Sequence, residues 1–435
     1  MQPRGSSRHR HTRPAVLIMV AAAWCTAPWP CPADVITDWD TKASAVASPA
    51  ALGQREQAIV DLSMFDAVNS LAGKYHAYLA RQKGFDGASP EAAAASAAAT
   101  ALAKLHPEKA PEFKAALDQY VTGLSAAHDA IANGMRLGEL AALRVVEIRA
   151  ADNATGDDTY RPRTKPGLYV PTATMVASTW PTMRPFVLER PDQFRPGPPV
   201  ALSSKEWASD YNEVKAYGAR NSAQRTPEQT EAAKFWLMTG PQAYYPIARQ
   251  FVAARHMNLV DSARFMAALA AALTDAYIAV FDAKYHDEFW RPMTAIRNGD
   301  IDGNPDTEID PAWQPLDATP LHPEYPCAHC ILSGTAVAMI EADGGFPDPH
   351  EFWLTSPMVP GVTHRWSSLQ AFTNEVANAR VWAGFHYRSS TRVGAAMGQE
   401  IGRYIALHFA QPENNAPSPA RRVPARWKVP GIQST

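Results

Sequence analysis

Three short clusters of basic and histidine residues lie in order along the C-terminal half of the chain. The first pairs Lys284 with Arg291, the second is Pro326-Cys327-Ala328-His329, and the third pairs Arg380 with His386. Cationic side chains donate strong hydrogen bonds to tetrahedral oxyanions, and imidazole exchanges protons near neutral pH. The set therefore predicts a site that holds such an anion and keeps one imidazole free for chemistry.

The spacing of the first pair predicts how its two cations meet. Lys284 and Arg291 are seven residues apart, which is two turns of an α-helix. If the apolar run before Lys284 continues as a helix through Arg291, both side chains leave the same face and converge on one anion. Pro292 then ends or kinks this helix near its second cation, because proline disrupts the helical hydrogen-bond ladder.

The second and third clusters are expected at helix ends. Pro326 suits a helix start, and the apolar residues 331–340 predict the helix that follows, so the N–H groups of residues 327–329 lie where anions bind. Six residues turn about 240° around a helix, so Arg380 and His386 do not share a face of one continuous helix. A break at Gly384 would let both turn inward.

The order and spacing of these clusters resemble the superfamily of vanadium-dependent haloperoxidases and type 2 phosphatidic acid phosphatases. Its pattern is K-x6-R-P, then P-S-G-H, then S-R-x5-H-x3-D. Residues 284–292 match the first block in full. In the second block Cys327 and Ala328 replace the Ser and the Gly, and in the third Ala379 and Ser390 replace the leading Ser and the trailing Asp. The segments KYHDEFWRPMTAIR and HPEYPCAHC are more similar to the sequences of soluble bacterial haloperoxidases than to those of membrane lipid phosphatases.

The resemblance implies a role for each matching residue. His386 would be the axial ligand of vanadate, or the nucleophile toward phosphate, and His329 would be the acid or base. The other groups implied to surround the anion are Lys284, Arg291, Arg380, Cys327 and the N–H of Ala328. Because Ser390 stands where the family has Asp, the partner that orients His386 is unidentified, and a backbone carbonyl could replace it.

Three functions from different classes follow from this site. In the first, vanadate is the cofactor and the enzyme oxidises halide with hydrogen peroxide, for use on a small organic substrate. In the second, the site has no cofactor and hydrolyses phosphate monoesters through a phosphohistidine at His386, as a soluble acid phosphatase. In the third, a non-catalytic helical protein binds an oxyanion. The Phe-Trp-Arg-Pro sequence at 289–292 and the apparent signal peptide favour the haloperoxidase. Cys327 and Ser390, which depart from the family pattern, leave the phosphatase and the non-catalytic protein open.

Helical periodicity dominates the chain and predicts an all-α fold of packed helices. The resemblance implies that these are helical bundles of the vanadium haloperoxidase and phosphatidic acid phosphatase type. We expect a signal peptide at 1–33, an N-terminal helical region at 34–200, a catalytic bundle at 201–412 and a Pro/Arg-rich tail at 413–435. Residues 160–200 contain nine prolines and predict an extended loop. The long helical segment 110–151 is expected to break at Gly134. Residues 265–281 predict an apolar core helix rather than a membrane span.

Composition and the N-terminus indicate an exported protein that does not bind nucleic acid. The net charge of −2 and the pI near 6.7 argue against a nucleic-acid partner. Four arginines precede an apolar run at 15–27, and a small residue before Asp34 offers a cleavage point, which predicts secretion or a periplasmic location. No other stretch predicts a membrane span, and the oligomeric state is not determined by the sequence.

Cys327 and Cys330 are the only cysteines expected in the mature chain, and they form a C-x-x-C motif with His329 inside. The βαβ context of a thioredoxin-like redox motif is missing, and Ile331 follows where a haem-attachment motif needs His. A local disulfide is compatible with an oxidising compartment. Such a bond would occupy the Cys327 thiol that could otherwise contact the anion.

Overall fold

The computed structural model describes residues 34–413, and this part of the chain is predominantly helical. Its regular elements are thirteen α-helices, four short 3-10 helices and one two-stranded antiparallel sheet. The all-α prediction is therefore confirmed. The predicted signal peptide at 1–33 and the predicted tail beyond residue 413 lie outside the described residues.

The first half of the described chain contains α1 Val35–Val46, α2 Ala50–Ala72, α3 Pro90–Leu105, α4 Ala110–Thr122 and α5 His128–Ala150. The second half contains α6 Lys205–Tyr217, α7 Pro227–Phe235, α8 Tyr245–Ala254, α9 Leu259–Asp287, α10 Pro292–Arg297, α11 Ala328–Ala342, α12 Leu369–Trp382 and α13 Arg388–His408. The 3-10 helices are η1 Pro107–Lys109, η2 Trp180–Thr182, η3 Pro241–Ala243 and η4 Gly299–Ile301. Strands β1 Phe352–Thr355 and β2 Thr363–Trp366 form a hairpin in which Phe352 pairs with Trp366.

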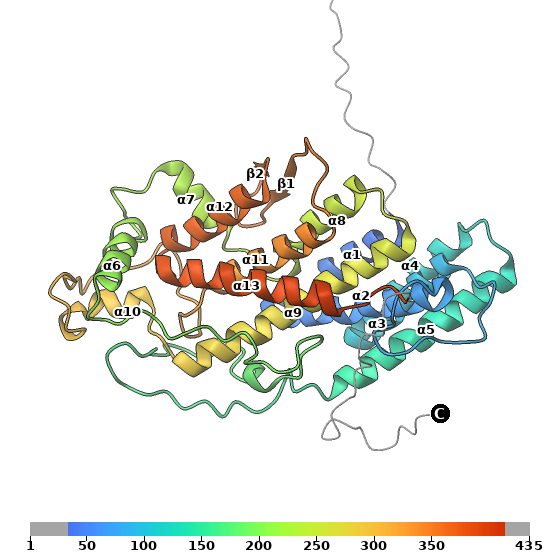
Figure 1. The fold of residues 1–435 in the computed structure, drawn as a ribbon, viewed down its shortest axis with the longest axis horizontal. Coiled ribbons are helices and arrows are strands. Elements are labelled where there is room, and N and C mark those ends of the chain that lie inside the picture. Colours follow the sequence, from blue (N-terminus) through green and yellow to red (C-terminus); the bar gives the residue numbers. More distant parts are fainter. Residues whose placement is uncertain (1–33, 414–435) are drawn as a thin grey trace, which may run out of the picture. The chain divides into compact units, whose positions relative to one another are not determined.

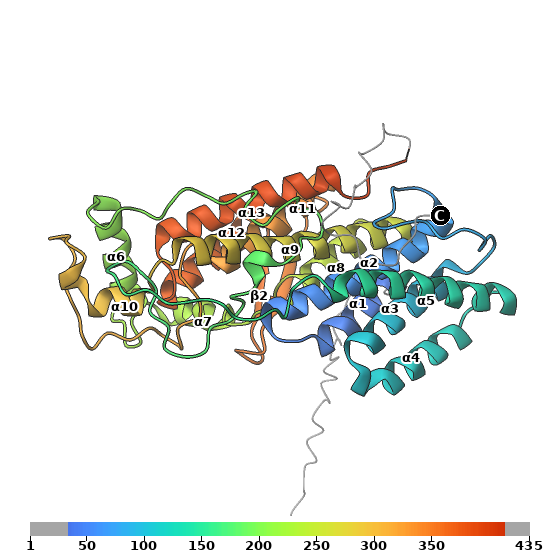
Figure 2. The ribbon, with the colours of Figure 1, turned by 90° about the horizontal axis from the view of Figure 1, so that it is seen from below.

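Helix α9 is the central element of the core. It contacts α2 of the N-terminal half and α11 and α13 of the C-terminal half, and it runs between them in Figures 1 and 2. Within residues 34–413 it is the one helix long and apolar enough to cross a membrane, but its 18-residue apolar window is entirely buried inside the fold. Phe265, Leu269 and Leu273 belong to the main hydrophobic cluster. The prediction of a core helix at 265–281 is confirmed.

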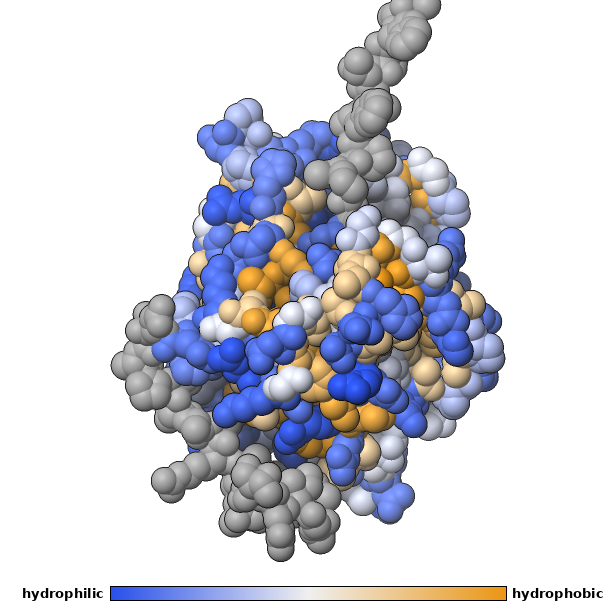
Figure 3. Space-filling view, turned by 90° about the vertical axis from the view of Figure 1, so that its right-hand side faces the viewer, coloured by the Kyte–Doolittle hydropathy of each residue, from blue (hydrophilic) through white to orange (hydrophobic). Residues whose placement is uncertain are grey.

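Small residues let the N-terminal helices pack closely. The Ala-rich α3 lies against α5, and a Cβ atom on Gly134 of α5 would be 2.4 Å from the carbonyl oxygen of Ser89. The prediction of a helix break at Gly134 is therefore wrong, because its missing side chain serves close packing. The break comes earlier, at Gly123, which caps α4. Figure 3 shows this end of the molecule, where hydrophilic residues cover much of the surface and apolar residues lie between them.

A cluster of buried polar side chains joins α1, α2 and α8. Gln57 donates to Asp40 Oδ1 at 2.7 Å, Arg249 forms an ion pair with Asp40, and Asp61 lies beside them. Burial raises the pKa of Asp40 to about 6, although Arg249 lowers it. Burial, together with the neighbouring Asp40 charge, raises the pKa of Asp61 well above its ordinary value. Tyr245 faces both carboxyls and is also buried.

We expect these two carboxyls to make the protein less stable as pH rises from about 4, near the ordinary pKa of an aspartic acid, through about 6, the pKa of buried Asp40. An acid with a raised pKa keeps its proton in the folded state after the unfolded state has lost it, so each such proton lowers the free energy of unfolding by up to about 1.4 kcal/mol per pH unit. Asp61→Asn mimics the protonated acid and should flatten the profile, whereas Asp118→Asn on exposed α4 should not. Urea unfolding across this pH range measures both. An unchanged slope in Asp61→Asn would show that Asp61 does not titrate there.

The Pro-rich segment is fastened to the central helix. Residues 160–200 have no regular element except η2, in agreement with the predicted extended loop. The carboxylate of Asp275, in the middle of α9, accepts from the N–H groups of Phe186, Val187 and Leu188 at 2.5, 2.6 and 2.7 Å. Three donors on one buried carboxylate fix the path of this segment along α9. The predicted domain boundary at residue 200 stays a prediction.

Candidate functional site

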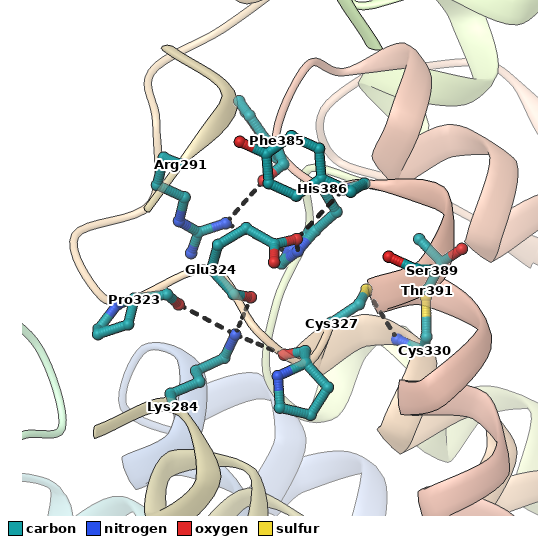
Figure 4. Close-up of polar contacts among 12 residues, drawn as sticks. Lys284, Arg291, Pro323, Glu324, Cys327, Cys330, Phe385, His386, Ser389 and Thr391 are labelled. Atoms are coloured by element: carbon teal, nitrogen blue, oxygen red, sulfur yellow. Dashed lines mark hydrogen bonds and ion pairs between the residues drawn. The ribbon is translucent and has the colours of Figure 1, made fainter. Parts of the chain in front are cut away.

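The two cations of the first cluster come from different segments. Helix α9 ends at Asp287, because Glu288 takes a left-handed conformation with φ of 50°. Lys284 is in the last turn of α9, and Arg291 is the N-cap residue of α10. The prediction that one helix carries both is therefore wrong. The turn at 288–290 redirects the chain, and in Figure 4 the two side chains reach the same region from different directions.

The second cluster lies at the start of α11. Cys327 is the N-cap residue, and its sulfur accepts from the Cys330 N–H at 3.3 Å. The helix begins at Ala328, two residues later than predicted from Pro326. The first N–H groups of a helix have no partner within it, so those of Ala328 and His329 are available to a ligand.

The third cluster is divided by a sharp change in chain direction. Helix α12 ends at Trp382, and Gly384 has φ of 77°, in the left-handed region that favours glycine. The predicted break at Gly384 is confirmed. Arg380 lies before this turn and His386 after it, and both side chains are buried, with 3% and 1% of their surface exposed.

His386 lies between a cation and a carboxylate. Its Nε2 is 3.3 Å from Arg291 Nη1, and its Nδ1 is 2.6 Å from Glu324 Oε1. Because a guanidinium only donates, Nε2 accepts and the ring proton is on Nδ1, from which it is donated to Glu324. Burial, followed by the charges of Arg291 and Lys284, lowers the pKa of His386 well below its ordinary value. The ring is therefore neutral, with its lone pair on Nε2.

Glu324 is the orienting partner that the sequence did not identify. It is fully buried, and its Oε1 also accepts from the Tyr387 N–H at 3.2 Å. Burial raises the pKa of Glu324 to about 7, while Lys284, Arg291 and the Ser390 hydroxyl lower it. Position 390 holds Asp in the family pattern, so here the loop before α11 supplies a carboxylate that the pattern places on α13. Its only sequence signal is its place in HPEYP, directly before the matched second block.

Lys284 holds the loop that carries Glu324. Its ammonium donates to the carbonyl oxygens of Pro323, Glu324 and Pro326 at 3.1, 2.6 and 2.5 Å, as Figure 4 shows. An ammonium has three N–H donors, so these contacts engage all of them. Burial, then the Arg291 charge, lowers the pKa of Lys284 well below its ordinary value. Lys284 therefore contributes charge and loop geometry, and a bound anion would compete with these carbonyls for its donors.

The two arginines are held by main-chain carbonyls. Arg291 donates from Nε to His322 and from Nη1 to Phe385, each at 2.9 Å, and Arg380 donates from Nη1 to Trp236 at 2.6 Å. Burial lowers the pKa of Arg291 to about 10. Arg380 Nε is buried and has no hydrogen-bond partner within residues 34–413. An unpaired buried donor on a cation is costly, and an anion oxygen would satisfy it.

His329 is also fixed and neutral. Its Nε2 is 3.0 Å from the Met238 carbonyl oxygen, so Nε2 carries the ring proton and Nδ1 is free to accept one. Burial, followed by the Arg380 charge, lowers the pKa of His329 well below its ordinary value. His322, which the sequence did not single out, lies on the other side of Arg291, with Nδ1 3.0 Å from Nη2.

The structure thus gathers the predicted side chains of the three clusters and adds Glu324. We call the following seven residues the anion site: Lys284, Arg291, Glu324, Cys327, His329, Arg380 and His386. It contains three buried cations and one buried carboxylate. The thiol of Cys327 adds partial charge, since its burial is outweighed by the Cys330 hydrogen bond and Arg380, which bring its pKa to about 7. This excess of positive charge, with the unpaired Arg380 Nε, fits a tetrahedral oxyanion such as vanadate or phosphate.

Glu324→Ala should weaken vanadate binding about 10–100-fold, the usual effect of removing a carboxylate that orients a metal-binding histidine. The Ser390 side chain contacts the Glu324 carboxylate, so an aspartate at position 390 would lie next to the place of the removed carboxylate. Adding Ser390→Asp to the Glu324→Ala protein should therefore restore most of the vanadate affinity. Equilibrium titration measures the vanadate affinity of the parent, of Glu324→Ala and of the double variant. If Glu324→Ala binds vanadate like the parent, Glu324 has no positioning role.

Comparisons with known proteins cover the segment that carries these residues. The family model described as VCPO second helical-bundle domain matches residues 264–415, which contain all seven residues of the anion site. The vanadium chloroperoxidase of Curvularia inaequalis is 29% identical over 182 residues. That match covers 34% of this chain, and the chain spans only 29% of the length of this relative.

Solved structures share the fold over nearly the whole chain. The first bacterial vanadium-dependent iodoperoxidase is 22% identical, with a TM-score of 0.73, over 87% of this chain and 95% of that one. An apo-type bacterial vanadium-dependent chloroperoxidase is 16% identical, with a TM-score of 0.68, over 83% and 94%. The matching family model, the related sequence and the common fold lead to one conclusion: residues 264–415 match the second helical-bundle domain of vanadium chloroperoxidase, within a fold that the chain shares with vanadium-dependent haloperoxidases.

Proposed function

We propose that this protein is a vanadate-dependent haloperoxidase that oxidises halide with hydrogen peroxide. The observation that supports this most is the neutral His386, whose Nε2 faces Arg291 while its Nδ1–H is held by Glu324 at 2.6 Å. This arrangement presents a lone pair to an anion inside a cluster of buried cations. Imidazole with its other nitrogen bound to a carboxylate is a strong and well-oriented metal ligand.

The residues of the anion site would have different roles in this reaction. His386 would hold vanadate through Nε2, and Arg291 and Arg380 would neutralise the charge of its oxygens, with the N–H of Ala328 and the Cys327 side chain completing the contacts. When bound, vanadate supplies a Lewis acid that activates peroxide toward a halide. Formation of hypohalous acid and water from halide and hydrogen peroxide consumes one proton. His329 would deliver that proton from Nδ1, which is free to take it up while Nε2–H stays on Met238.

A phosphatase is the second candidate, and one observation favours it. The neutral, carboxylate-oriented His386 is as suitable for attack on phosphorus as for binding vanadium, because both anions are tetrahedral and similarly charged. In that case His386 forms a phosphohistidine, and His329 protonates the leaving alcohol of a phosphate monoester.

One protein preparation distinguishes the two candidates. The metal-free protein is given vanadate, bromide, hydrogen peroxide and a phenolic dye, and a second portion without vanadate is given an aryl phosphate. We expect bromination that depends on vanadate and is inhibited by phosphate, with only weak phosphatase activity. Robust phosphatase activity without vanadate-dependent halogenation would establish the second candidate, and the absence of both activities would leave a binding protein.

We also propose that the protein is exported, because the basic N-terminus and short apolar run resemble a signal peptide. N-terminal sequencing of the exported fraction should give a start close to Asp34. An exported protein that still begins with Met1 would contradict this.

A further inference from the structure

Two cysteines lie at the start of α11, and one of them, Cys327, belongs to the anion site. Cys327 is the N-cap residue and Cys330 is the third residue of the helix. Both are free thiols and are buried, with 0% and 1% of their surface exposed. The Cys330 N–H donates a hydrogen bond to the Cys327 sulfur, with 3.3 Å between the nitrogen and the sulfur. Figure 4 shows both cysteines in the same region as His386 and Glu324.

The position of this pair suits disulfide formation. Side chains three residues apart on a helical turn are neighbours, with Cβ atoms about 5–6 Å apart before any adjustment, and a disulfide needs Cβ atoms about 3.5–4.5 Å apart. The N-cap residue lies just outside the helical conformation, since Cys327 has φ of −65° and ψ of 116°. It can therefore turn toward Cys330 without unwinding α11. A helix N-terminus and C-x-x-C spacing both favour the thiolate, the form of cysteine that an oxidant attacks.

Cys327 lies among the groups that would hold the anion. Its N–H donates to the Ser390 carbonyl oxygen at 3.3 Å, which ties it to the start of α13 beside Glu324. Its sulfur interacts electrostatically with Arg380, Lys284 and Arg291. Where the family pattern has a serine hydroxyl, this chain therefore has a group that peroxide can oxidise.

We propose that Cys327 and Cys330 are a reversible oxidation site that controls anion binding. Hydrogen peroxide transfers one oxygen to the Cys327 thiolate, giving a sulfenic acid and, after uptake of a proton, one water. The Cys330 thiol then attacks that sulfur, the S–O bond breaks, and a second water leaves as the disulfide forms. The two thiols lose two electrons to one peroxide. The proposal rests on the proposed function in one respect, because that function brings peroxide to the site.

Oxidation should weaken the anion site. A disulfide bonds the Cys327 sulfur to that of Cys330 at about 2.05 Å and removes the S–H proton that the thiol form of Cys327 would donate to an anion oxygen. It also ties down the turn that carries the N–H groups of Ala328 and His329, which are the ones available to a ligand. The loss of about one hydrogen bond corresponds to about tenfold lower affinity.

The test uses the full-length protein without vanadate or halide, with inorganic phosphate as the probe. After treatment with hydrogen peroxide, peptide mass mapping should find the 327–330 disulfide, and calorimetry should show phosphate affinity reduced about tenfold. Dithiothreitol should restore it. Cys327→Ser keeps a hydroxyl donor and should bind phosphate equally before and after peroxide. Cys330→Ser should lose affinity without recovery, because without a resolving thiol excess peroxide oxidises the Cys327 sulfenic acid further to a sulfinic acid, which dithiothreitol does not reduce.

Several results would overturn the proposal. They are the absence of the disulfide after peroxide treatment, unchanged phosphate affinity in the oxidised protein, or the same peroxide-induced loss in Cys327→Ser. If Cys327→Ser does not fold, Cys330→Ser decides, because full recovery of its affinity with dithiothreitol would contradict the assigned roles. None of these measurements requires halogenation, so failure of the proposed function and failure of this inference give different outcomes.

Discussion

His386→Ala is expected to abolish both vanadate-dependent bromination and any hydrolysis of an aryl phosphate. Nε2 of His386 is the atom that would bind vanadium or phosphorus, and no other neutral imidazole in the described chain is held between Arg291 and Glu324. The variant keeps the cations, so inorganic phosphate should still bind, with its affinity reduced by about tenfold for the lost contact. Bromination and phosphatase assays, with phosphate calorimetry beside them, measure the three effects.

His286→Ala is the matched control for this variant. His286 is exposed, two residues beyond Lys284 in α9, and has no contact with the anion site. It should retain parental activity. If His386→Ala keeps more than a small fraction of the parental bromination rate, His386 does not hold the cofactor.

His329→Ala should slow turnover about 10²–10⁴-fold, the usual effect of removing a positioned acid or base. Affinity for vanadate should remain close to that of the parent, because the imidazole is neutral and its Nε2–H is engaged by the Met238 carbonyl. Vanadate titration and steady-state bromination separate the two quantities.

His329→Gln distinguishes a proton-transfer role from a structural one. The glutamine amide can donate to the Met238 carbonyl as Nε2 does, so packing at the start of α11 is kept, but an amide does not exchange a proton near neutral pH. We expect this variant to be as slow as His329→Ala. Recovery of parental turnover in His329→Gln would mean that His329 only supports the structure.

The helical fold and the residues of the anion site other than Glu324 can be predicted from the sequence because both depend on local patterns. The 3.6-residue periodicity of α9 showed a core helix, and the left-handed turn at Gly384 followed from the angular separation of Arg380 and His386. The match of residues 284–292 and 326–329 to ordered motifs then placed the clusters at one site. Each of these inferences uses residues that are close in the chain.

The parts that were missed depend on contacts between distant residues. Lys284 and Arg291 do not share a helix, because a left-handed Glu288 ends α9, and no rule would assign that conformation to a glutamate in an otherwise helical run. The sequence predicts a helix break at Gly134, but the role of this glycine is close packing against Ser89, the N-cap residue of α3, which lies 45 positions away. Glu324 could not be recognised as the partner of His386, 62 residues later, because its carboxylate replaces one that the motif places at position 390.

A crystal structure of the protein soaked with vanadate tests the central claim most directly. We expect a single vanadium position, located by its anomalous signal and bonded to His386 Nε2. The vanadate oxygens should contact Arg291 and Arg380, and the hydrogen bond between His386 Nδ1 and Glu324 should be retained. Vanadium bound away from His386, or none within the anion site at saturating vanadate, would contradict it.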